Sequence, residues 1–93
     1  MELLIKKWQS KFGISDWQIK TERILPKQVV YSGETYFVAI ERDFDKKEGT
    51  IYHDIDLCEE SIIHELLHVK NPEKDEDWVN MKTNQLLKLE YEK

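Results

Sequence analysis

The chain has 93 residues, of which 40% are hydrophobic and 11% aromatic, so it can form one domain with one core and is too apolar for a disordered acidic segment. Its net charge is −5 and no run of Lys and Arg exceeds two residues, which excludes the clustered basic surface of a nucleic-acid-binding protein. The single cysteine, Cys58, excludes an internal disulfide, and no segment is apolar over a membrane-spanning length, so we expect a cytoplasmic protein with no membrane partner.

The first part of the chain predicts one helix followed by strands. Apolar residues recur at helical spacing over residues 2–12, and Gly13 suits the left-handed conformation that often ends a helix. Residues 16–23 alternate apolar and polar side chains, as a half-buried strand does. After a polar turn, residues 35–42 are rich in β-branched and aromatic side chains, and residues 50–57 resume a strand pattern after the DKKEG break.

The second part of the chain predicts two helices. Residues 58–69 carry apolar side chains around most of a helical circumference, which indicates a largely buried helix. Asp56 and Glu59 have the spacing of a capping box at its start, and Asp75 is suited to cap a last helix. We therefore predict a single α+β domain over residues 1–93, with an N-terminal helix, a small three-stranded and mainly antiparallel sheet, a buried helix and a C-terminal helix.

The predicted buried helix contains the sequence HELLH, in which His64, Glu65 and His68 are the polar members. Residues four apart in a helix lie on one face, about 6 Å apart along the axis, so both imidazoles can bind one ion. Glu65 follows His64 directly and therefore lies about 100° from it around the helix axis. In that position its carboxylate can reach a metal-bound water and act as a general base. A His-Glu-x-x-His pattern on a helix is typical of zinc metalloproteases, so the segment predicts a hydrolytic site with Zn²⁺ as cofactor.

A catalytic zinc ion usually has three protein ligands, so a third ligand must come from elsewhere in the chain. Glu76 is the best candidate, because it opens the last helix only a short loop after His68. An acidic residue in the first turn is also favoured by the helix dipole alone, and Asp75 and Asp77 in the same turn are alternative ligands. His53, the only other histidine, is expected at the surface or beside the substrate.

The segment EDWVN, from Glu76 to Asn80, resembles the E-x-x-x-D element of gluzincin peptidases. This resemblance implies that Glu76 is a zinc ligand and that residue 80 supports a zinc-bound histidine. Asn80 stands where those enzymes have Asp, so it can accept an imidazole N–H but adds no charge. Together with CEESIIHELLHV, DWQI and FVAI, the segment makes the whole chain similar to the minigluzincins, a family of zinc peptidase-like domains of about this length. That resemblance also implies latency, since C-terminal segments in the family shield the active site.

We therefore predict a zinc metallopeptidase of the endopeptidase type, with Glu65 as general base and a peptide or unfolded protein as substrate. The alternative is a non-catalytic zinc-binding or regulatory module that uses the histidine pair structurally. The substrate is expected to pair with a sheet edge at residues 50–56. The short loop before the last helix also allows a homodimer in which the C-terminal helix is swapped, with tail residues such as Glu90 and Glu92 near the partner's metal.

Overall fold

The computed structural model describes residues 2–24 and 38–91 of the chain. Within these residues the fold has three helices and three strands, which confirms the predicted α+β class. The predicted polar turn before the second strand, and the first three residues of that predicted strand, lie outside the described residues. In chain order the elements are α1 (Glu2–Lys11), β1 (Gln18–Arg23), β2 (Val38–Asp43), β3 (Glu48–His53), α2 (Glu59–Lys70) and α3 (Glu76–Tyr91).

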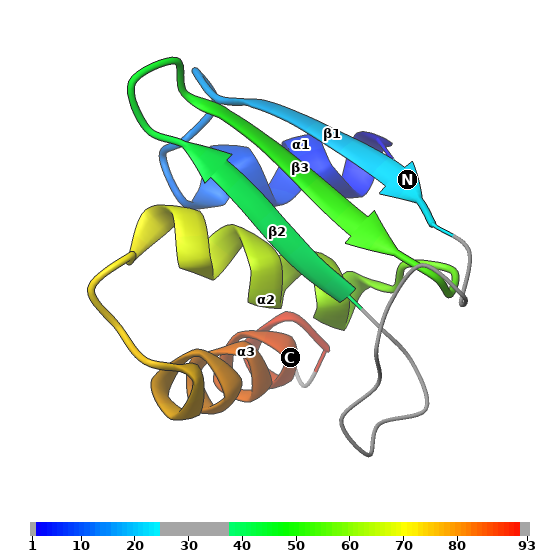
Figure 1. Cartoon of the computed structure of the whole chain (residues 1–93). Coiled ribbons are helices and arrows are strands. Elements are labelled where there is room, and N and C mark those ends of the chain that lie inside the picture. The colour runs from blue at the N-terminus through cyan, green and yellow to red at the C-terminus, as the bar shows by residue number, and fades with distance from the viewer. Residues whose placement is uncertain (1, 25–37, 92–93) are drawn as a thin grey trace.

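The sheet is mixed, where mainly antiparallel pairing was expected. β3 lies in the middle of the strand order β1-β3-β2 and pairs antiparallel with β2 but parallel with β1 (Figure 1). β2 and β3 form a hairpin, whose turn is stabilised by the Asp43 carboxylate accepting the backbone N–H groups of Asp45 and Lys46, each at 3.1 Å. β1 joins this hairpin beside β3 and runs in the same direction as β3, so the sheet contains one parallel and one antiparallel pair.

The central place of β3 makes the prediction of a sheet edge at residues 50–56 wrong. Both neighbours of β3 are occupied along its whole length, and residues 54–56 lie beyond the end of the strand. An alternating pattern identifies a half-buried strand but does not say where that strand stands in the sheet. The edges of the described sheet are β1 and β2, and β2 is the edge strand that contacts α2.

Helix α2 is the element on which most of the others pack. Figure 1 shows α1 and α2 behind the sheet and α3 on the side of α2 away from it, and α2 contacts α1, α3 and β2. Ile62, Ile63 and Leu66 of α2 have no exposed surface and form one core with side chains of α1 and α3, including Trp8 and Val79. The predicted burial of this helix is confirmed.

Two of the three predicted helix-end features are present. Gly13 follows α1 with φ 70°, and the Asp75 carboxylate accepts the backbone N–H of Trp78 at 2.9 Å at the start of α3. No helix among the described residues is both long and apolar enough to cross a membrane.

The predicted capping box at the start of α2 is wrong. Cys58 precedes the helix without a side-chain capping bond, and the Asp56 carboxylate is paired with Arg23 at 2.6 Å. The Glu59 carboxylate accepts the indole N–H of Trp8 at 2.7 Å, and it also binds Lys7 and the Tyr91 hydroxyl. Donors from α1 and α3 therefore occupy the carboxylate that a capping box would use.

Truncation of a fully buried α2 side chain should lower stability far more than the same truncation at the surface. We expect Leu66→Ala, at a residue with 0% exposure, to lower the free energy of unfolding by about 2–5 kcal/mol through lost burial and a residual cavity. Leu3→Ala, at a residue that is 84% exposed, should change it by less than about 0.5 kcal/mol. Urea denaturation of the two variants measures both values, and similar effects would contradict the assignment of α2 to the core.

Candidate metal centre

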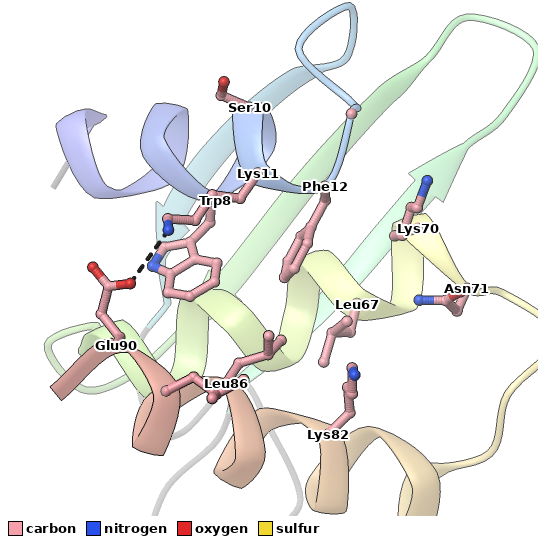
Figure 2. A pocket seen from close by; sticks show the side chains of 12 residues that line it. Trp8, Ser10, Lys11, Phe12, Leu67, Lys70, Asn71, Lys82, Leu86 and Glu90 are labelled. Atoms are coloured by element: carbon pink, nitrogen blue, oxygen red, sulfur yellow. Dashed lines mark ion pairs between the residues drawn. The ribbon is translucent and has the colours of Figure 1, made fainter. Parts of the chain in front are cut away.

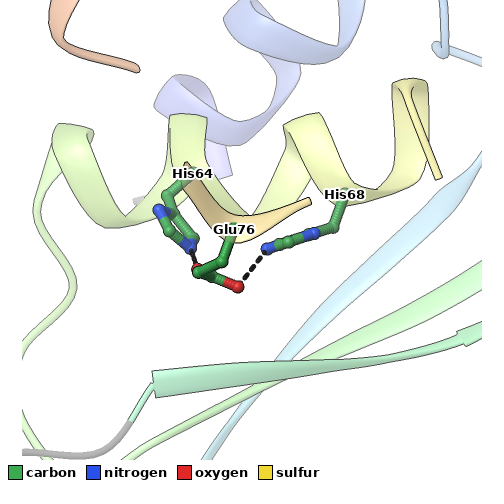
Figure 3. A group of neighbouring side chains, drawn as sticks. All are labelled: His64, His68 and Glu76. Carbon is green, nitrogen blue, oxygen red and sulfur yellow. Dashed lines mark ion pairs between the residues drawn. The ribbon is translucent and has the colours of Figure 1, made fainter. Parts of the chain in front are cut away.

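The structure brings His64, His68 and Glu76 together on the face of α2 that looks toward the start of α3 (Figure 3). The two imidazole rings lie one helical turn apart, with their centroids separated by 5.1 Å. The Glu76 carboxylate reaches both rings: one oxygen pairs with His64 Nε2, and the other lies 3.2 Å from His68 Nε2. One potential ligand atom from each residue lies within 4.8 Å of the other two. Two imidazoles and one carboxylate therefore surround a single point.

The geometry of this group suits a zinc ion. Bonds of about 2.0–2.2 Å in a tetrahedral site place ligand atoms roughly 3.3–3.5 Å apart, so small side-chain rotations would bring these three atoms to ligating distance. Two histidines and one glutamate leave a fourth position open, as in catalytic rather than closed structural zinc sites. The donor set therefore fits the ion that the sequence pattern predicts.

The rival candidates for the third ligand do not join this group. Asp75 is occupied as the cap of α3, and Asp77 lies in the same turn without reaching the two histidines. His53 ends β3, and its Nδ1 lies 2.6 Å from the backbone carbonyl oxygen of Ile55. Among the described residues, Glu76 is the acidic side chain that meets the histidine pair.

Asn80 lies near the histidines without binding them. It is exposed on α3 and lines the same cavity as His64, yet no hydrogen bond joins its amide to either imidazole in the described part of the chain. The supporting role implied by the gluzincin resemblance stays a prediction.

Glu65 is the buried acid of the site. Only 5% of its surface is exposed, and its carboxyl has no hydrogen-bond donor among the described residues. Burial raises the pKa of Glu65 to about 8, with a further contribution from the nearby Glu76 charge, while the Arg42 guanidinium acts in the opposite direction. A carboxyl with this pKa is mostly protonated at neutral pH in the metal-free protein, and a bound cation would favour the carboxylate. Glu65 therefore has the proton affinity that a general acid or base needs near neutrality.

Burial also acts on the second histidine. It lowers the pKa of His68, although the Glu76 carboxylate partly counteracts this effect. A lower pKa favours the neutral imidazole, which is the form that binds metals.

Arg42 is a residue near the site that the sequence did not reveal. It lies on the edge strand β2, and its guanidinium donates a hydrogen bond to the backbone carbonyl of His68 at 2.6 Å. That carbonyl belongs to the last turn of α2, where no helical N–H is available to it. Arg42 thus ties β2 to the metal-site end of α2, and nothing in an exposed strand arginine indicates such a contact from sequence.

A cavity of about 610 Å³ opens beside the metal centre. Its size lies within the usual range for ligand sites. Residues of α2 and α3 form most of its wall, and the first residue of β2 lies at its margin. The lining comprises Val38, Ile55, Cys58, Glu60, Ser61, His64, Glu65, Glu76 and Asn80.

No protein-family model matches the chain, and no match was found among curated proteins or solved structures. The class of site is therefore defined by its own geometry: a helix with a His-Glu-x-x-His segment, completed by a glutamate from the next helix.

Proposed function

We propose that the protein is a zinc-dependent metallopeptidase of the minigluzincin type, with His64, His68 and Glu76 as metal ligands. The observation that supports it is the meeting of two imidazoles and one carboxylate beside a buried glutamate on an open cavity. A structural zinc site would gain nothing from Glu65, because its burial beside the cavity disfavours the charged carboxylate. Catalysis would give the Glu65 carboxyl a function that a structural zinc site does not.

The proposed reaction is hydrolysis of a peptide bond. A zinc ion held by the three ligands would act as a Lewis acid on water and on the scissile carbonyl. Glu65 would take the proton of the attacking water and then pass it to the leaving amine. Burial raises the pKa of Glu65 in the metal-free protein, and a bound zinc ion would favour the carboxylate form that accepts the proton.

A peptide or unfolded-protein substrate would bind in extended form along β2. This strand is an edge of the described sheet, it contacts α2, and its first residue lines the metal-site cavity. An exposed edge offers unpaired backbone N–H and C=O groups to an added strand. This assignment replaces the central strand β3, which has no free edge.

One chain holds all three proposed ligands. α3 packs on α2 of its own chain, and its own Glu76 reaches the histidines. At the other end of the helix, Glu90 pairs with Lys7 and Lys11 of α1, and none of residues 81–91 lines the metal-site cavity. The swapped homodimer and latency through the C-terminal segment stay predictions, while Glu92 lies outside the described residues.

Glu76→Gln should weaken zinc binding. The substitution keeps the size of the side chain but removes its charge, so we expect the zinc Kd to rise at least about tenfold. Asp77→Asn removes the same charge from the same helical turn and should leave the affinity unchanged. Competition with a chromogenic zinc chelator measures both constants, and equal affinities in the two variants would exclude Glu76 as a ligand.

Glu65→Gln should abolish hydrolysis while zinc is retained. Loss of the general base is expected to lower kcat by about 10²–10⁴-fold. Glu60→Gln is the matched control, because Glu60 lines the same cavity from the first turn of α2. Cleavage of a fluorogenic unfolded protein and zinc content by plasma mass spectrometry provide the two readouts. A zinc-loaded wild type that cleaves nothing, before and after trimming of its C-terminal residues, would favour the non-catalytic module.

Backbone methylation of a substrate peptide should reveal the pairing with β2. N-methyl groups on alternate residues block every N–H on one side of an extended peptide. We expect one methylation register to raise KM by about tenfold or more and the register shifted by one residue to leave it nearly unchanged. Equal KM values for both registers would exclude strand pairing.

A further inference from the structure

A second cavity, of about 740 Å³, lies between α1, α2 and α3, and none of the described residues lines both this cavity and the metal-site cavity. Figure 2 shows that α1 and α3 form its two sides and that Leu67 of α2 lies between them. Its apolar wall consists of Trp8, Phe12, Leu67, Leu86 and Leu89. We call this cavity the helical groove.

The two ends of the helical groove differ in charge. At one end Lys11 pairs with Glu90, with Nζ and Oε2 3.3 Å apart, and the same carboxylate also pairs with Lys7. At the other end Lys70, Asn71 and Lys82 line the groove, and Figure 2 shows Lys82 rising from α3 toward Leu67 with the Asn71 amide turned toward the same space. In the described part of the chain, neither lysine has a carboxylate partner. This end of the groove therefore offers positive charge and an amide to an anion.

Among the described residues, the polar side chains of the wall between the two ends, Trp8 and Ser10, offer no free hydrogen-bonding group to the groove. The indole N–H of Trp8 is donated to Glu59 at 2.7 Å, and the Ser10 hydroxyl points away from the groove in Figure 2. A peptide backbone laid along this wall would leave N–H and C=O groups unpaired, which costs free energy. A hydrocarbon chain has no such groups and gains from the same burial.

We propose that the helical groove binds a single-chain fatty acid. The carboxylate would lie at Lys82 and Asn71, and the hydrocarbon tail would pass Leu67 and Leu86 toward Trp8. The ion pair of Lys11 with Glu90 closes the far end, so the ligand needs one charged head and one apolar tail. The proposal depends on the groove alone and holds whether or not the metal centre is catalytic.

Calorimetric titration of the full chain with dodecanoate, below its micelle concentration, tests the proposal. We expect saturable binding with one site, and at least about tenfold weaker binding to Lys82→Gln, since a hydrogen bond to a charged group is lost. Lys88→Gln is the matched control, because Lys88 is an exposed lysine of the same helix that does not line the groove. It should bind dodecanoate as the wild type does. Dodecan-1-ol, with the same tail and no charge, should bind at least about tenfold more weakly than dodecanoate.

A second variant tests the position of the tail. Leu89 lines the groove but is 69% exposed, so Leu89→Glu should fold normally, which circular dichroism checks, and should weaken binding by placing a charge beside the tail. Unchanged affinity in both Lys82→Gln and Leu89→Glu would overturn the proposal. Equal affinities for dodecanoate and dodecan-1-ol would overturn it as well, because the groove would then not recognise a carboxylate.

Discussion

The burial of α2 is the constraint on which the rest of the structure depends. Its apolar side chains meet α1, α3 and the sheet, so the rotation of the helix about its axis is fixed by packing. Once that rotation is fixed, His64 and His68 must share one direction, because they are one helical turn apart. A site of this kind needs ligands held within narrow limits, and a buried helix provides that rigidity more surely than a loop does.

The second helix of the site is held at both of its ends. Asp75 caps the first turn of α3, immediately before Glu76, and Thr83 is buried in the middle of the helix. At the last turn Glu90 pairs with two lysines of α1, and the Tyr91 hydroxyl binds Glu59. Exposed ion pairs contribute little singly, but this cluster also includes the half-buried Glu59 and the buried indole of Trp8. The position of Glu76 is thus set by contacts along the whole helix.

Features that depend on neighbours in sequence could be predicted, and features that depend on distant partners could not. Helical periodicity and the spacing of HELLH are local properties, so the buried helix and its histidine pair could be inferred from the sequence alone. The cap at Asp75 is local in the same way.

The place of β3 in the sheet depends on how β1 joins the hairpin, and an alternating pattern is the same in a central and an edge strand. The prediction of a capping box at the start of α2 was wrong for a similar reason. The Glu59 carboxylate binds three side chains that are more than thirty residues away in the chain: Lys7, Trp8 and Tyr91. The contact of Arg42 with the His68 carbonyl gave no sequence signal either.

The proposed third ligand, Glu76, lies on a separate helix, so metal binding is linked to the docking of that helix. The histidine pair exists as soon as α2 is formed, whereas Glu76 joins it only when α3 is packed in place. Any free energy gained by coordination through Glu76 is therefore also free energy that holds α3 against α2. Bound metal would therefore add to the contacts that already dock α3, so the ion would stabilise the tertiary structure of the chain as well as supply its chemistry.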